Sequence, residues 1–85
     1  MNKYEYEDVG GKIIIRINGL MHLSFIKNNV VGIYTYFNEA KTYWYIEISI
    51  KNCYSKMVVE YNDKNVFEEI VKIFEEIINP KLRMR

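Results

Sequence analysis

The sequence predicts a single α+β domain in which a five-stranded antiparallel β-meander packs one face against a C-terminal amphipathic helix. Three observations favour this fold class. Apolar and polar residues alternate through most of residues 12–61, the period of half-buried strands. From residue 64 the apolar period becomes that of a helix. Short polar segments separate the strands, and the 85 residues, 49% of them hydrophobic, suit one domain spanning 1–85.

The first predicted hairpin contains a conflict between its turn and its hydrophobic pattern. The predicted strands span residues 12–18, 21–27, 30–37, 42–50 and 56–61. An Asn-Gly pair after Ile17 is typical of a two-residue turn. That turn would set Ile15 opposite His22 and turn the core residues of the second strand outward. We therefore predict a three-residue turn, which sets Ile15 opposite Leu23. Residues 3–7, before a Gly-Gly break, form either a sixth strand or a loose arm.

The central hairpin comprises residues 30–50, with a polar bend at residues 38–41. We expect an Asn-containing turn to pair its first strand with the preceding one, with Leu23 opposite Ile33 and His22 opposite Tyr34. The predicted core face carries Val31, Ile33, Phe37, Trp44, Ile46, Ile48 and Ile50. The predicted outer face carries Tyr34, Tyr36, Tyr43 and Tyr45. Within the hairpin we expect Tyr36 opposite Tyr43 and Tyr34 opposite Tyr45.

The C-terminal helix is predicted over residues 64–78. Asp63 is the expected N-cap, and Pro80 ends the helix. The basic tail 81–85 is expected to fray. Because the helix and the sheet each have one apolar face, these faces should meet. Strand 56–61 directs Met57, Val59 and Tyr61 toward the same core.

A meander followed by a C-terminal helix is similar to pleckstrin-homology-like domains. That resemblance implies an alternative architecture, in which the strands close into a small barrel capped by the helix. The chain has no motif diagnostic of that family, so the resemblance assigns no binding residues.

Composition and motifs exclude several function classes. The net charge of +1 is unlike that of a general polyanion binder. The chain lacks phosphate-binding loops and hydrolase motifs, and one His and one Cys cannot build a usual zinc site. We expect no enzyme activity, no metal and no cofactor. Cys53 is read as an incidental free thiol.

The cellular setting is inferred from the same features. The polar N-terminal residues carry no signal peptide, and a lone cysteine suits a reducing compartment. No apolar run is long enough to span a membrane. We expect a cytoplasmic protein, in the host cytoplasm if a phage encodes it. The abundance of Lys, Ile, Asn and Tyr fits an AT-rich bacterial or phage genome.

The candidate binding surface is the aromatic outer face of the sheet. Its predicted residues are Tyr34, Tyr36, Tyr43 and Tyr45, with Arg16, His22 and Lys56 as polar points. Contiguous apolar patches and tyrosines are typical of interfaces. The sequence therefore predicts a non-enzymatic protein-interaction module that acts through this face or an edge strand. Its partner is another copy of the chain, as a homodimer, or a different protein, as for a phage or bacterial inhibitor or accessory protein.

The alternative function is binding of a nucleotide or single-stranded nucleic acid. The same tyrosines would stack bases, with Arg16 and Lys56 near phosphates. The almost neutral charge, together with Glu47 and Glu60 on the same face, favours a protein partner.

Overall fold

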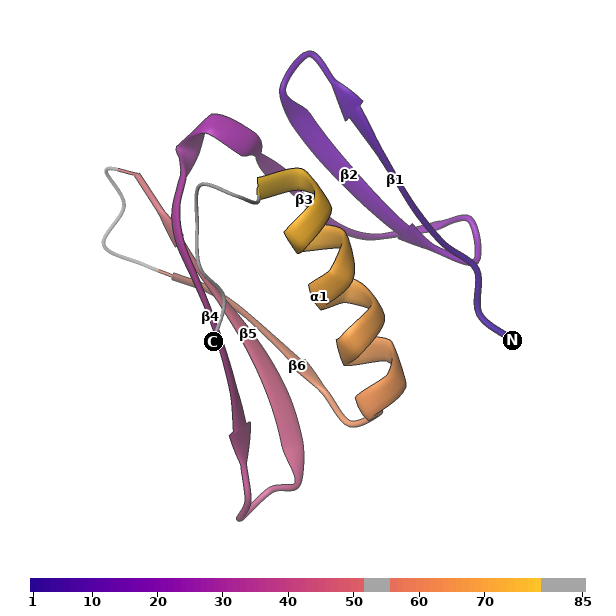
Figure 1. Ribbon diagram of the computed structural model, residues 1–85, viewed down its shortest axis with the longest axis vertical. Coiled ribbons are helices and arrows are strands. Elements are labelled where there is room, and N and C mark those ends of the chain that lie inside the picture. The colour runs from indigo at the N-terminus through magenta and orange to yellow at the C-terminus, as the bar shows by residue number, and fades with distance from the viewer. Residues whose placement is uncertain (52–55, 79–85) are drawn as a thin grey trace.

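Two antiparallel sheets and one C-terminal helix make up the computed structural model, which describes residues 1–51 and 56–78 (Figure 1). Sheet A contains β1 (Tyr4–Val9), β2 (Lys12–Ile17) and β3 (Leu20–Ile26). Sheet B contains β4 (Val30–Asn38), β5 (Tyr43–Ile50) and β6 (Lys56–Tyr61), and α1 spans Lys64–Ile78. The α+β class is confirmed. The turn around Cys53 and the tail 81–85 lie outside the described residues.

The predicted single meander is wrong, because β3 and β4 do not pair. A 3-10 turn, η1 (Lys27–Asn29), carries the chain from sheet A to sheet B. Lys27 N donates a hydrogen bond to Gly11 O at 2.9 Å, and Lys51 N donates one to Asn29 O at 2.6 Å. The turn is thus anchored to both sheets. Among the described residues no ladder joins the sheets, so the hydrogen-bonded strands do not close into the alternative barrel.

The first hairpin resolves the conflict between turn and pattern with a β-bulge. Asn18 and Gly19 form the two-residue connection with φ of 55° and 81°, so the predicted three-residue turn is wrong. Ile17 faces Leu20, but the register shifts between Ile15 and Arg16, so that Ile15 still faces Leu23. The extra residue in the bulge preserves the sidedness of β3.

The N-terminal segment is a strand and not a loose arm. β1 pairs with β2 from Tyr4, opposite Ile17, to Val9, opposite Lys12. A connection through Gly10 and Gly11, both at positive φ, joins the two strands. Glycine accepts this backbone conformation without steric cost.

The central hairpin keeps the predicted sidedness in a different register. Tyr36 lies opposite Tyr45, and Tyr34 lies opposite Glu47, so the predicted tyrosine pairs are wrong. The bend occupies residues 39–42, one residue later than predicted. Asn38 Oδ1 accepts a hydrogen bond from Lys41 N at 3.3 Å, which closes the bend across residues 38–41. A slip of two residues leaves every side chain on its original face.

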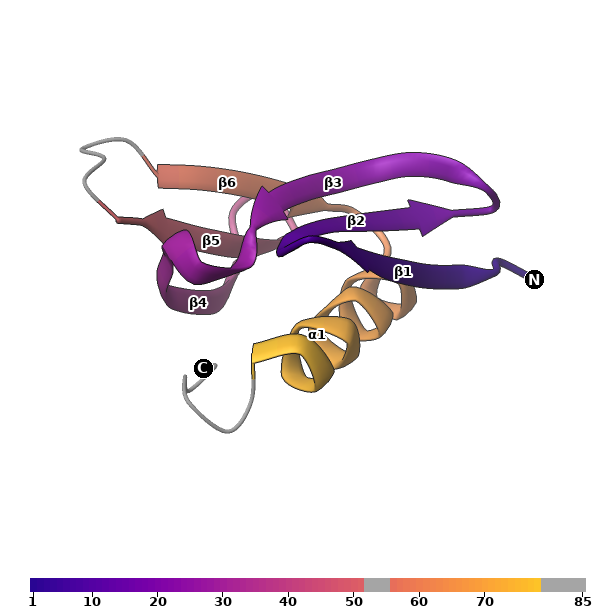
Figure 2. The same ribbon diagram turned by 90° about the horizontal axis from the view of Figure 1, so that it is seen from above.

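The helix begins and ends where the sequence predicts. Asp63 Oδ1 accepts hydrogen bonds from Asn65 N at 2.9 Å and Val66 N at 3.4 Å, as an N-cap does. Figure 2 shows α1 on one side of the molecule, beneath the strands of both sheets. The helix has 15 residues, and no helix in the described part is long and apolar enough to cross a membrane.

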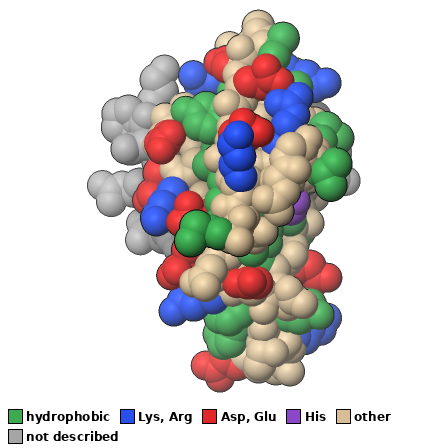
Figure 3. Space-filling model, turned by 90° about the vertical axis from the view of Figure 1, so that its right-hand side faces the viewer, with side chains coloured by type: hydrophobic (Ala, Val, Ile, Leu, Met, Phe, Trp, Pro, Cys, Tyr) green, Lys and Arg blue, Asp and Glu red, His purple; other side chains and the backbone are tan. Residues whose placement is uncertain are grey.

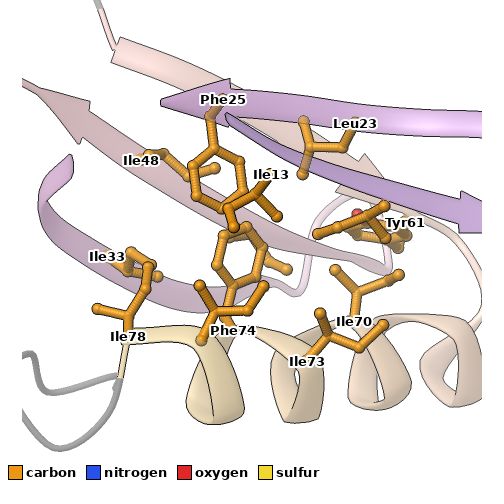
Figure 4. Packing of buried hydrophobic residues seen from close by; sticks show 13 residues of the cluster. Ile13, Leu23, Phe25, Ile33, Ile48, Tyr61, Ile70, Ile73, Phe74 and Ile78 are labelled. Carbon is orange, nitrogen blue, oxygen red and sulfur yellow. The ribbon is translucent and has the colours of Figure 1, made fainter. Parts of the chain in front are cut away.

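The core lies between the helix and the two sheets. Phe74 of α1 is fully buried and stacks against Phe25 of β3, with ring centroids 5.3 Å apart (Figure 4). Ile33 and Ile48 of sheet B complete this contact region. Two predicted core residues are exposed instead. Val31 is the extra residue of a second bulge and is 55% exposed, while Phe37 lies near the end of β4 and is 44% exposed.

Candidate functional site

The candidate site is the outer face of sheet B, which we call the tyrosine face. Strand alternation places even-numbered residues of β4 and β6 and odd-numbered residues of β5 on this face. Its residues are Tyr34, Tyr36, Tyr43, Tyr45, Glu47, Lys56, Val58 and Glu60. The fully buried Ile33, Ile46 and Ile48 point the other way, toward the helix. The face is thus opposite the core, as the sequence predicts.

Tyr45 supports this face from below and is not a contact residue. Only 7% of it is exposed, and its ring stacks on that of Tyr36 with centroids 5.0 Å apart and an angle of 11° between the planes. Burial raises the pKa of the Tyr45 phenol, and the neighbouring Glu60 carboxylate adds to the increase. The prediction that all four tyrosines form an open surface therefore needs correction. Tyr45 holds Tyr36 in place, and Tyr43 is half-buried.

Tyr34, Tyr36 and Val58 are the open apolar side chains of the face. They are 51%, 45% and 48% exposed, respectively. Tyr34 lies over Gly32, where an added Cβ atom would be 3.4 Å from the Tyr34 ring. The glycine thus gives the ring room to lie along the strand. Tyr34, Glu47 and Val58 form one row across the three strands.

The polar residues of the face form an ion pair. Lys56 Nζ lies 3.0 Å from Glu47 Oε2, and the Glu47 side chain is only 19% exposed. Lys56 is therefore on the predicted surface, but its charge is balanced locally. Because the Lys56 side chain is 55% exposed, water screens this pair, and it adds little stability.

Arg16 and His22 do not join the tyrosines, so this part of the predicted site is wrong. Arg16 lies on the outer face of sheet A, where its Nη1 is 2.6 Å from Glu7 Oε1. His22 is the unpaired residue of the β3 bulge, and its Nε2 lies 2.7 Å from the Tyr61 hydroxyl. Burial lowers the pKa of His22. The conflict at the first turn was the only sequence signal for this bulge.

A groove that the sequence does not predict lies on the helix side of β4. The groove has a volume of about 440 Å³. It is lined by Thr35, Phe67, Glu68, Val71 and Lys72. Its apolar part comes from Phe67 and Val71, at the edge of the apolar stripe of the helix, although the pattern predicts that the whole stripe faces the core. A second hollow of about 460 Å³ lies between the N-terminal residues and the start of α1.

Neither charge on the face in Figure 3 nor metal-binding chemistry among the described residues marks another site. Acidic and basic side chains are intermixed on the face shown in Figure 3. Across residues 1–51 and 56–78, no group of three or more His, Cys, Asp or Glu side chains could hold a metal ion.

Comparison with protein-family models, curated proteins and solved structures finds no match to this chain.

Proposed function

We propose that this chain is a non-enzymatic, cytoplasmic protein-interaction module that docks through the tyrosine face and the adjoining edge of β4. The observation that carries the proposal is the group of half-exposed apolar side chains Tyr34, Tyr36 and Val58, on the face turned away from the core. Monomeric proteins rarely expose large contiguous apolar patches, and tyrosine is enriched where binding energy concentrates.

The support beneath the open side chains favours docking. Tyr36 is stacked on the buried Tyr45, so its ring is already held in one orientation before a partner binds. An ordered aromatic side chain loses less conformational entropy on binding than a mobile one. Glu47 lies between Tyr34 and Val58, where Lys56 balances its charge. Glu60 is a further polar residue of the face, opposite Tyr45.

A protein partner is better supported than a nucleic acid. Base stacking needs cations near the tyrosines to bind the phosphates. Lys56 is paired with Glu47, and Arg16 lies on the other sheet beside Glu7. A titration with short labelled oligonucleotides, followed by fluorescence anisotropy at low salt, tests this alternative. Saturable binding that Tyr34→Ser abolishes would favour it over a protein partner.

The proposed partner is a second copy of the chain or a different protein of a bacterial or phage system. The test variant is Tyr34→Ser/Tyr36→Ser, and the matched control is Val9→Ser/Ile26→Ser on the outer face of sheet A. Val9 and Ile26 are similarly exposed, at 56% and 46%. All four positions are at the surface, so both variants should keep a thermal midpoint within a few degrees of that of the unmodified protein.

Association is measured by light scattering across a wide concentration range and by affinity capture from extracts of the source cell. The unmodified chain and the control should associate, with themselves or with one recurrent protein, and the tyrosine variant should not. A chain that stays monomeric and captures nothing dependent on Tyr34 and Tyr36 would contradict the proposal.

A further inference from the structure

The free edge of β4 lacks most of the features that normally prevent strands from pairing with other chains. β4 is the outer strand of sheet B, and no other described strand pairs with its second side. Its nine residues, VVGIYTYFN, include no charge and no proline. Exposed edges are usually protected by charges, prolines, bulges or a covering element. Within residues 1–51 and 56–78, the only such feature of β4 is a bulge near its start, between Val30 and Gly32.

The other edge strands are protected. β1 carries three acidic residues and no basic one, so two copies of it would repel each other. β6 carries Lys56 and Glu60, and its Tyr61 is bonded to His22 of β3. β3 contains the bulge at His22. β3 is also uncharged, but its bulge interrupts it at His22, whereas β4 keeps the regular, uncharged stretch of residues 32–38 after its own bulge.

The β4 edge adjoins an apolar surface that an added strand would cover. Thr35 of β4 lines the groove of about 440 Å³ together with Phe67 and Val71 of α1. Phe37, 44% exposed, lies on the same face of β4 as Thr35 and packs its ring against Trp44, with centroids 4.9 Å apart. An added strand would gain backbone hydrogen bonds from β4 and apolar contact with the groove, as in β-strand addition.

We propose that this strand is β4 of a second copy of the chain, paired antiparallel about a twofold axis that passes beside Thr35. This inference deepens the proposed function by naming the partner. The regular part of β4 after its bulge spans residues 32–38, and residue 35 is its centre. Pairing about this centre sets Tyr34 opposite Tyr36, Ile33 opposite Phe37 and Thr35 opposite its own copy. Aromatic, aromatic–β-branched and Thr–Thr pairs are the cross-strand pairs that stabilise antiparallel sheets.

The charge distribution suits a second copy. β4 brings no charge to the contact, so no like charges face each other along the strand. The rim of the groove carries one acidic residue, Glu68, and one basic residue, Lys72. A twofold axis perpendicular to the sheet keeps both helices on one face and brings the two grooves together. The contact uses the same surface on both copies, so it closes as a dimer and does not propagate.

The register is tested with charges at the two exposed tyrosines. In the chain Tyr34→Lys/Tyr36→Glu, each lysine lies opposite a glutamate of the second copy. In the chain Tyr34→Lys/Tyr36→Lys, lysines face each other. Both positions are exposed, so both variants should fold, which circular dichroism verifies. Light scattering should then give twice the chain mass of 10.3 kDa for the unmodified chain and for the Lys/Glu chain, and a monomer for the Lys/Lys chain.

Three results would overturn the inference. A monomeric unmodified chain excludes self-pairing, and the docking of a different protein is then judged separately by the Tyr34→Ser/Tyr36→Ser comparison. Two dimeric variants would show that the chains associate elsewhere. Two monomeric variants would exclude this register. If the strands paired about Tyr34 instead, the lysines of the Lys/Glu chain would face each other, and this chain would also be a monomer.

Discussion

Replacing Phe74 with alanine tests whether one core unites the two sheets. Phe74 is fully buried on α1 and stacks on Phe25 of sheet A, within a cluster that includes Ile33 and Ile48 of sheet B. Truncation of a buried phenylalanine costs about 3–5 kcal/mol, through lost transfer energy and the cavity that remains. A domain of this length has a free energy of unfolding of about 4–13 kcal/mol. The variant should therefore lose a large part of its stability.

The assay is urea denaturation followed by two signals. Far-UV circular dichroism reports all elements, while fluorescence of Trp44, the only tryptophan, reports sheet B. With m of about 1–3 kcal/mol/M, the urea midpoint of Phe74→Ala should fall by about 1 M or more. The two signals should still change together, because neither sheet has a separate core.

The matched control is Phe37→Ala. Phe37 is 44% exposed and contacts Trp44, so its loss should cost about 0.5–1.5 kcal/mol. Equal losses of unfolding free energy in the two variants would refute the placement of Phe74 at the centre of the core. Separate transitions of dichroism and fluorescence in the unmodified protein would refute the single core.

Three further outcomes are expected from local features. Asp63→Ala should lower the free energy of unfolding by about 0.5–2 kcal/mol through loss of the N-cap, and Asp63→Asn should lower it much less; equal losses in urea titrations would argue against capping. Gly19→Ala should cost about 1–2 kcal/mol, because φ is 81° there, and an unchanged urea midpoint would contradict the strained turn. Burial lowers the pKa of His22 from 6.5, so the neutral ring favours the folded state. That stabilisation is complete above pH 6.5 and is lost as pH falls through the lowered pKa; His22→Gln should reduce the loss of thermal stability between about pH 8 and about pH 5, and identical pH profiles would contradict this account.

The sequence predicts best what depends on local patterns. The predicted bounds of α1 match those of the structure, because the N-cap at Asp63 and the broad apolar stripe are both local features of the sequence. Likewise, β6 follows from a simple alternation that ends at Tyr61. Features that need long-range information were predicted wrongly. A polar turn at residues 27–29 has the same sequence pattern whether it closes a hairpin or joins two sheets. Only the hydrogen bonds between this turn and Gly11 and Lys51 distinguish the two arrangements.

The candidate site shows the same division. The sidedness of the tyrosines follows from alternation, which a register slip of two residues does not change. The burial of Tyr45 depends on the ring that lies beside it after that slip, so sequence alone could not reveal it. Arg16 would lie beside the tyrosines only if the strands formed one continuous sheet, and they form two.

The position of α1 after both sheets has a consequence for biosynthesis. A growing polypeptide emerges from the ribosome with its N-terminal part first. Both sheets can therefore form from nearby residues before the helix that covers them has been translated. Until residue 78 has emerged, Ile13, Ile33 and Ile48 have no helix to cover them. The nascent chain thus exposes hydrophobic surfaces of the kind that chaperones bind. It completes its core only when the last turn of α1 is available.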